Sequence, residues 1–67
     1  MSELITHVIY DVEKRHGRMP TDTLITIKPR TKEVTLKPIK GMNQTLRREL
    51  LSAVITRGYS LTITANQ

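Results

Sequence analysis

The side chains that could support catalysis are few, and their spacing matches no established catalytic arrangement. Nucleophilic catalysis needs a hydroxyl or thiol within hydrogen-bond reach of a base, and a third group usually orients that base. The chain has no cysteine, and its only imidazoles belong to His7 and His16. His7 and Asp11 share a helix face four residues apart, but the simpler interpretation is that both are solvated. We therefore expect a non-enzymatic protein without catalytic residues.

The same inventory argues against a resident metal ion or cofactor. A zinc or iron site takes three or four ligands from Cys, His or carboxylates. His7 and His16 are nine residues apart, on opposite sides of one predicted helix, so they cannot hold one ion together. Gly17, Gly41 and Gly58 occur singly, without the spacing of a phosphate-binding or dinucleotide-binding loop. We expect no metal and no cofactor.

Charge is the strongest chemical signal, and it is concentrated in one segment. The 67 residues include 11 Lys and Arg against 6 Asp and Glu, a net charge of +5. Residues 28–48 hold seven basic residues and one acid, Glu33, so this segment carries +6 and the remainder −1. The seven are Lys28, Arg30, Lys32, Lys37, Lys40, Arg47 and Arg48. Because Lys, Arg and hydroxyl groups bind phosphates, these seven are the candidate nucleic-acid-binding residues.

Other interpretations of the basic segment stay open. Lysines on a small hairpin protect it against edge-to-edge aggregation and keep it soluble, and a basic surface also attracts acidic proteins. The chain has no Phe or Trp, and both Tyr lie outside the segment. It therefore lacks the aromatic platform on which single-stranded nucleic acid stacks. The first hypothesis is a small regulatory or architectural module that binds nucleic acid.

The second hypothesis is a protein-binding adaptor or inhibitor. Tyr10 faces away from the apolar stripe of its predicted helix, and an outward tyrosine is an efficient interface anchor. Leu51 and Ile55 widen the apolar arc of their helix beyond what one surface covers. The interface would be an exposed strand edge, the helix face that carries Tyr10, or the part of the second helix that carries Leu51 and Ile55. Short cysteine-free chains of this kind occur among phage, plasmid and stress regulators, which is an association and not a physical argument.

Hydrophobic periodicity predicts two helices. Apolar residues repeat at helical spacing from Leu4 to Val12, which predicts a helix over 3–16 with Ser2 as its N-cap. A second helix should begin after Asn43, a suitable N-cap, and end at about residue 57, where a glycine supplies the left-handed exit.

Runs of β-branched residues predict a hairpin between these helices. Residues 23–28 and 34–39 read as its strands. A four-residue loop over 30–33 would pair Pro29 with Val34. In that register four aliphatic residues share one face of the hairpin: Ile25, Ile27, Val34 and Leu36.

The third strand and the element order define the expected fold. Residues 59–65 alternate apolar and hydroxyl side chains, which is typical of a half-buried strand. The order α-β-β-α-β predicts a single domain over 1–67, an α+β two-layer sandwich with both helices on one face. We expect a three-stranded antiparallel sheet of order 3-1-2, in which Leu51 and Ile55 can pack on the first helix. Placing the third strand beside the second is the alternative, and it would make that pair parallel.

Size and hydropathy set the remaining expectations. Leu, Ile and Val account for 18 of the 67 residues, enough for one aliphatic core. Because a domain of this size buries only about 60% of its unfolded surface, a homodimer that extends the core stays open. The sequence shows neither an apolar run long enough to span a membrane nor a signal peptide, so a cytoplasmic chain without membrane contact is expected.

Overall fold

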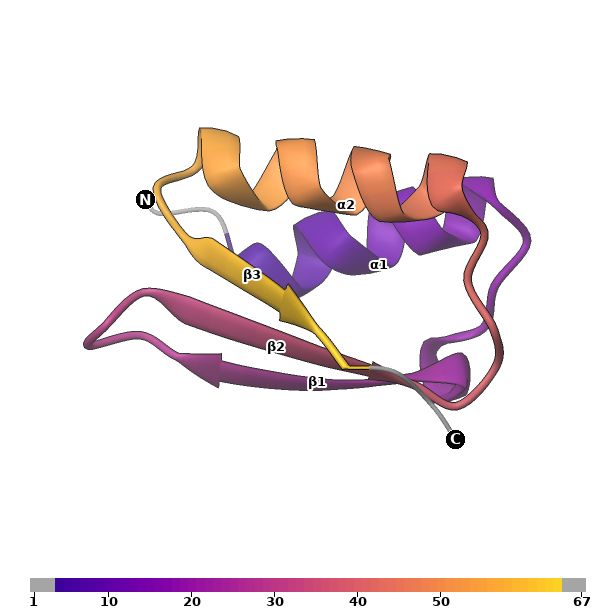
Figure 1. Ribbon diagram of the computed structural model, residues 1–67, viewed down its shortest axis with the longest axis horizontal. Coiled ribbons are helices and arrows are strands. Elements are labelled where there is room, and N and C mark those ends of the chain that lie inside the picture. Colours follow the sequence, from indigo (N-terminus) through magenta and orange to yellow (C-terminus); the bar gives the residue numbers. More distant parts are fainter. Residues whose placement is uncertain (1–3, 65–67) are drawn as a thin grey trace.

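The computed structural model describes residues 4–64, in which two helices cover one face of a three-stranded sheet (Figure 1). The predicted α+β class and element order are confirmed. The elements are α1 (Ile5–Arg15), a single 3-10 turn (Pro20–Asp22), β1 (Thr23–Lys28), β2 (Glu33–Pro38), α2 (Gln44–Thr56) and β3 (Ser60–Ile63). The predicted N-cap Ser2, its neighbour Glu3 and the predicted strand residue Ala65 lie outside the described residues.

Helix α1 forms where the apolar stripe predicted it. Its buried aliphatic residues are Ile5, Val8, Ile9 and Val12. The helix ends at Gly17, whose φ of 76° reverses the chain at low steric cost. The Arg18 amide then donates to the Glu13 carbonyl at 3.0 Å, the six-to-one bond of a Schellman cap. This cap turns Arg18 back under the helix.

Helix α2 begins and ends at the expected signals. The Asn43 side chain accepts a hydrogen bond from the Leu46 amide at 2.8 Å, which confirms Asn43 as the N-cap. At the other end Gly58 has a φ of 84°. Leu46, Leu50 and Val54 bury one stripe of the helix against α1 and the sheet. None of the helices within residues 4–64 combines the length and apolarity that crossing a bilayer requires.

The expectation that Leu51 and Ile55 pack on the first helix is wrong. Leu51 is 43% and Ile55 54% exposed. Helix α1 lies against the other flank of α2, where His16 Nε2 is 3.2 Å from Glu49 Oε2. Since one flank of α2 meets α1 and the next meets the sheet, the flank that carries Leu51 and Ile55 is left open.

The hairpin has the predicted faces but a different register. Ile27 pairs with Val34, and the turn comprises the four residues 29–32 instead of 30–33. The predicted pairing of Pro29 with Val34 is therefore wrong by two residues. Because a two-residue shift preserves the alternation of side chains, the predicted aliphatic face still points to the helices. Pro29, which has no amide proton to donate, lies in the turn.

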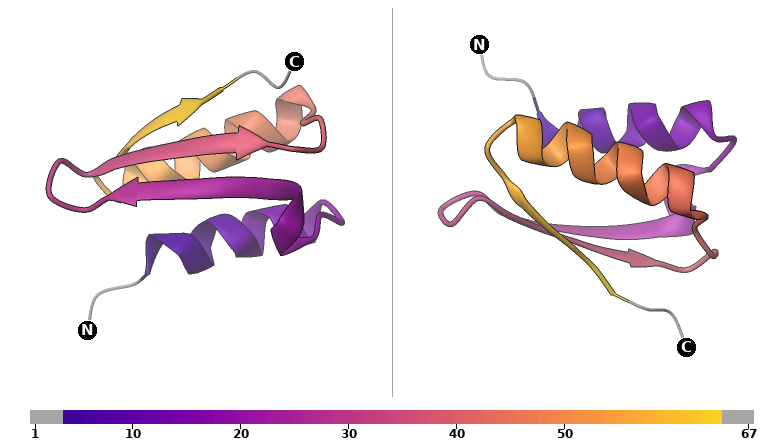
Figure 2. Two further views of the ribbon diagram at one scale, coloured as in Figure 1. Left: turned by 90° about the horizontal axis from the view of Figure 1, so that it is seen from below. Right: turned by 45° about the horizontal axis from the view of Figure 1, so that its top comes forward.

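The predicted sheet order 3-1-2, antiparallel throughout, is also wrong. The observed order is β1-β2-β3, and β3 runs parallel to β2, with Val34 opposite Leu61 and Leu36 opposite Ile63. The reason is the placement of the two helices on the sheet. Helix α1 flanks β1, whereas α2 lies behind β2 and β3 (Figure 2). A helix that returns the chain over the sheet delivers β3 beside β2 as a strand–helix–strand unit.

Candidate functional site

The face of the sheet opposite the helices is open in the described part of the chain (Figure 1). It carries the side chains that alternate with the buried ones. Lys28 lies beside Glu33 at the turn end of the hairpin, and Leu24 lies beside Lys37 at the other end. Both lysines are exposed, as expected from their position in the strands. We call this surface the outer sheet face.

A row of three threonines crosses the middle of the outer sheet face. Thr26 is the cross-strand neighbour of Thr35, and Thr35 is the neighbour of Thr62. Strands are spaced about 4.8 Å apart, so the row extends over roughly 10 Å. The β-branched side chains suit a strand, and their hydroxyls supply donors and acceptors without charge. Thr35 is the central member of the row because β3 pairs with β2 instead of β1.

The hairpin turn carries two further basic side chains. Arg30 and Lys32 are both exposed. Lys32 has a φ of 54°, in the left-handed region that residues with a Cβ seldom occupy. In this conformation its carbonyl accepts a 2.9 Å hydrogen bond from the Ser60 amide. The turn is thereby tied to the start of β3, and its charges are held at the end of the sheet.

The seven predicted nucleic-acid-binding residues divide between two regions. Five belong to the hairpin and its flanks, because Lys40 follows β2 at the end away from the turn. Arg47 and Arg48 instead lie in the first turns of α2, beside β3. All seven are exposed, and none forms an ion pair within residues 4–64. The five basic residues of the hairpin and its flanks thus accompany the sheet, whereas the two arginines belong to the helix layer.

The two helix faces predicted as alternative protein interfaces lie on different surfaces. Tyr10 is half-buried and lines a hollow of about 300 Å³ with Asp11, Lys14 and Met19. Leu51 instead lines a groove between α2 and β3, and Ile55 is exposed one turn further along α2. No described surface contains all three residues.

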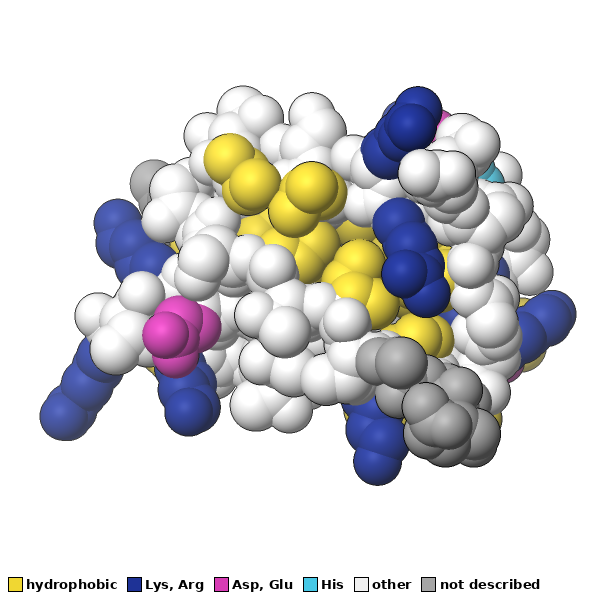
Figure 3. Space-filling model, in the orientation of Figure 1, with side chains coloured by type: hydrophobic (Ala, Val, Ile, Leu, Met, Phe, Trp, Pro, Cys, Tyr) yellow, Lys and Arg dark blue, Asp and Glu magenta, His cyan; other side chains and the backbone are white. Residues whose placement is uncertain are grey.

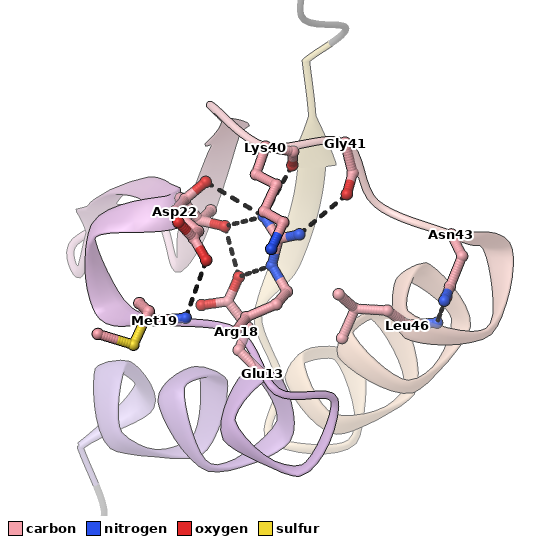
Figure 4. Close-up of polar contacts among 9 residues, drawn as sticks. Glu13, Arg18, Met19, Asp22, Lys40, Gly41, Asn43 and Leu46 are labelled. Carbon is pink, nitrogen blue, oxygen red and sulfur yellow. Dashed lines mark hydrogen bonds and ion pairs between the residues drawn. The ribbon is translucent and has the colours of Figure 1, made fainter.

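A buried ion pair was missed by the sequence reasoning (Figure 4). Arg18 Nε lies 3.3 Å from Oε2 of Glu13, and the same oxygen accepts a hydrogen bond from the Thr23 hydroxyl. Glu13 is 1% and Arg18 9% exposed. The signal was present in part, since Glu13 follows Ile9 by four residues and therefore borders the apolar stripe of α1. Position alone did not reveal its partner.

The Arg18 side chain also donates hydrogen bonds to backbone carbonyls of two separate loops. Its guanidinium donates to the carbonyls of Asp22, Lys40 and Gly41 at 3.1, 2.8 and 2.9 Å. One side chain thereby joins the connection before β1 to the loop between β2 and α2 (Figure 4). That loop leads to Asn43 and the start of α2. Arg18 and the amides of Ile39 and Lys40, which both donate to the Asp22 carbonyl, thus fix the backbone of Lys40 relative to β1.

Side chains suited to hold a metal ion do not converge in the described structure. Within residues 4–64 no three His, Asp or Glu side chains lie close enough together to form such a site. Glu13, the most deeply buried acid, directs one oxygen to Arg18 and Thr23, and its other oxygen has no hydrogen-bond partner among the described residues.

Comparison with known proteins yields no relative. No protein-family model matches the chain, and neither a curated protein nor a solved structure matches it.

Proposed function

We propose that this protein binds duplex nucleic acid without catalysing a reaction, in a regulatory or architectural role. The interface is the outer sheet face together with the hairpin turn. The observation that carries the proposal is that Lys28, Lys37 and a row of uncharged hydroxyls lie on a face that no described element covers. The exposed Arg30 and Lys32 lie in the turn at one end of this face, and the exposed Lys40 follows β2 at the other end.

The shape of this surface suits a nucleic-acid groove. A two-stranded β-ribbon fits the major groove of B-DNA, which is about 12 Å wide. In this sheet β3 adds a third strand beside β2, and three strands span roughly 10 Å. The hairpin strands are six residues long, so about 20 Å separates the charges of the turn from Lys40. Lys28 and Lys37 lie between these ends. Basic residues therefore accompany the ribbon along its whole length, where phosphates border the groove.

The hydroxyl row supports contacts of another kind. Threonine hydroxyls donate to phosphate oxygens and accept from amino groups of bases. The row carries no aromatic side chain, so base stacking is not available to it. A duplex, whose bases are already stacked, is the ligand that this face accommodates better than a single strand.

The test is a salt series with fluorescein-labelled duplex DNA, duplex RNA and single-stranded DNA, followed by anisotropy. Five phosphate contacts predict a slope of log K against log salt of about −4.5, equivalent to about a 500-fold loss between roughly 50 and 200 mM salt. Lys37→Glu should weaken binding to every sequence. Lys14→Glu, the same charge change on α1, is the matched control. Absence of duplex binding at about 50 mM salt, or equal effects of the two variants, would overturn the proposal.

A further inference from the structure

An apolar groove runs between α2 and β3, on a different side of the molecule from the outer sheet face. Its volume is about 290 Å³, and its lining residues are Gln44, Arg47, Arg48, Leu51, Leu61 and Ile63. Figure 3 shows hydrophobic side chains gathered over α2 and β3, with Lys or Arg side chains beside them. The exposed Ile55 lies one turn further along α2.

The open edge of β3 borders this groove. The Ser60 amide donates to the Lys32 carbonyl and the Thr64 amide to the Leu36 carbonyl, both at 2.9 Å. Successive residues of a strand direct their backbone groups to alternate sides. The amides and carbonyls of Leu61 and Ile63 therefore point away from β2, toward an edge with which no segment of residues 4–64 pairs. The residues whose side chains line the groove thus also offer the free backbone groups.

The charges beside the groove indicate which kind of occupant it favours. Arg47 and Arg48 are exposed and form no ion pair within residues 4–64, so they add two positive charges to an apolar floor. The nearest acid along α2, Glu49, contacts His16 on the opposite flank. A second copy of the chain would bring the same two arginines and a net charge of +5 to the contact. Repulsion between like charges disfavours that pairing, and an acidic occupant is favoured.

We infer that the α2–β3 groove binds an acidic, extended segment of a partner protein by strand addition to β3. Leu61 and Ile63 supply two amides and two carbonyls to the added strand. Its alternate apolar side chains contact Leu51 and Leu61, and its carboxylates bind Arg47 and Arg48, which lie at the end of the groove where α2 begins.

Two synthetic peptides test this inference with the full chain. In the first, Leu-Thr-Leu-Thr-Glu-Thr-Glu, the groove-facing positions are two leucines followed by two glutamates. The second is its reverse, Glu-Thr-Glu-Thr-Leu-Thr-Leu, because the added strand can run in either direction. We expect one of them to bind with a Kd below about 1 mM, and to shift the NMR amide signals of Leu61 and Ile63. The same peptide N-methylated at the residues that face β3 should not bind, because it cannot donate to the edge.

Matched variants separate the groove from other surfaces. Arg47→Glu and Leu51→Asp should each weaken peptide binding at least about tenfold. Lys14→Glu and Leu24→Asp, at an exposed lysine on α1 and an exposed leucine on the outer sheet face, should leave it unchanged. All four positions are exposed, and thermal unfolding of each variant confirms that it folds. Lys37→Glu should weaken duplex binding without affecting the peptide, so failure of one proposal is distinguishable from failure of the other.

Three results would overturn the inference. The first is that neither peptide shifts the Leu61 and Ile63 amides at about 1 mM. The second is a dimer by sedimentation that Leu51→Asp dissociates, which would assign the groove to a second copy. The third is protection of the Leu61 and Ile63 amides by duplex DNA in place of peptide, which would assign Arg47 and Arg48 to the nucleic-acid interface.

Discussion

Arg18 Nε lies 3.3 Å from Oε2 of Glu13, and both side chains are almost completely buried. Three loop carbonyls and the Thr23 hydroxyl accept the remaining hydrogen bonds of the guanidinium. A buried charge is tolerated when it is paired and hydrogen-bonded, and it is costly when its partner is lost. In a domain of this size, removal of one partner therefore costs a large fraction of the total stability.

The Glu13–Arg18 pair predicts a steep loss of stability on removal of one charge. Glu13→Gln keeps the shape of the side chain but leaves the Arg18 charge buried without a counterion. We expect the free energy of unfolding to fall by about 3–5 kcal/mol, measured by urea denaturation. Glu49→Gln, which removes the charge from the half-exposed contact with His16, is the control and should cost less than about 1 kcal/mol. Equal losses in the two variants would show that burial does not set the strength of the pair.

The threonine row predicts an effect on binding that differs from that of a charge. Thr35→Val removes the central hydroxyl and keeps the β-branched shape of the side chain. We expect duplex affinity to fall by about 5- to 10-fold, the equivalent of one hydrogen bond. The salt dependence should stay unchanged, because no counterion is released by a hydroxyl contact.

Lys37→Gln is the comparison for Thr35→Val. It should lower affinity and also reduce the salt slope by about 0.9, because one phosphate contact is lost. The contact of the hydroxyl row with the nucleic acid would be refuted if Thr35→Val bound duplex DNA like the parent protein at every salt concentration.

The N-cap of α2 predicts a smaller and local change in stability. Asn43→Ala removes the acceptor of the Leu46 amide, and the free energy of unfolding should fall by about 1 kcal/mol. Asn43→Asp retains an acceptor and adds a negative charge at the positive end of the helix dipole, so it should be at least as stable as the parent. Thermal denaturation of both variants measures the difference. A loss in Asn43→Asp as large as in Asn43→Ala would contradict the capping role.

Local sequence patterns predicted the elements, because each element carries its own signal. The apolar stripe of α1, the Asn43 cap and the alternation of 59–65 are properties of neighbouring residues. The hairpin faces were predicted for the same reason. The hairpin register was not predicted correctly. Two registers that differ by two residues leave each side chain on the same face of the sheet, so the hydrophobic pattern does not distinguish them. The register depends on the left-handed Lys32, whose carbonyl accepts from Ser60, 28 residues further along the chain.

Features that join distant segments could not be predicted from local sequence patterns. The alternation that identifies β3 does not say which strand it pairs with, and the strand–helix–strand unit formed by β2, α2 and β3 was the relevant signal. The role of Arg18 was hidden because its acceptors are backbone carbonyls, which every residue has. For the candidate site, the sequence located the basic residues. Their division between the outer sheet face and the α2–β3 groove follows from where β3 lies.

The parallel pairing of β2 with β3 predicts which engineered disulfide can form. The natural chain has no cysteine, so a pair of introduced cysteines has no competitor. Thr35 and Thr62 are direct neighbours on the outer sheet face, within the roughly 4.4–6.8 Å between Cα atoms that a disulfide requires. Thr26 and Thr62 are two strands apart, at about 10 Å. We therefore expect the double variant Thr35→Cys/Thr62→Cys to oxidise to an intramolecular disulfide, and Thr26→Cys/Thr62→Cys to remain reduced as a monomer.

Mass spectrometry after mild oxidation distinguishes the two outcomes, because each disulfide removes two hydrogen atoms, whose two electrons pass to the oxidant. The sheet order 3-1-2 would place Thr62 beside the β1 strand, and the Thr26→Cys/Thr62→Cys variant would then oxidise readily. That result would also change the order of the threonine row, since Thr26 instead of Thr35 would lie between the other two. The crosslinking experiment therefore tests the topology and the hydroxyl surface together, independently of any ligand.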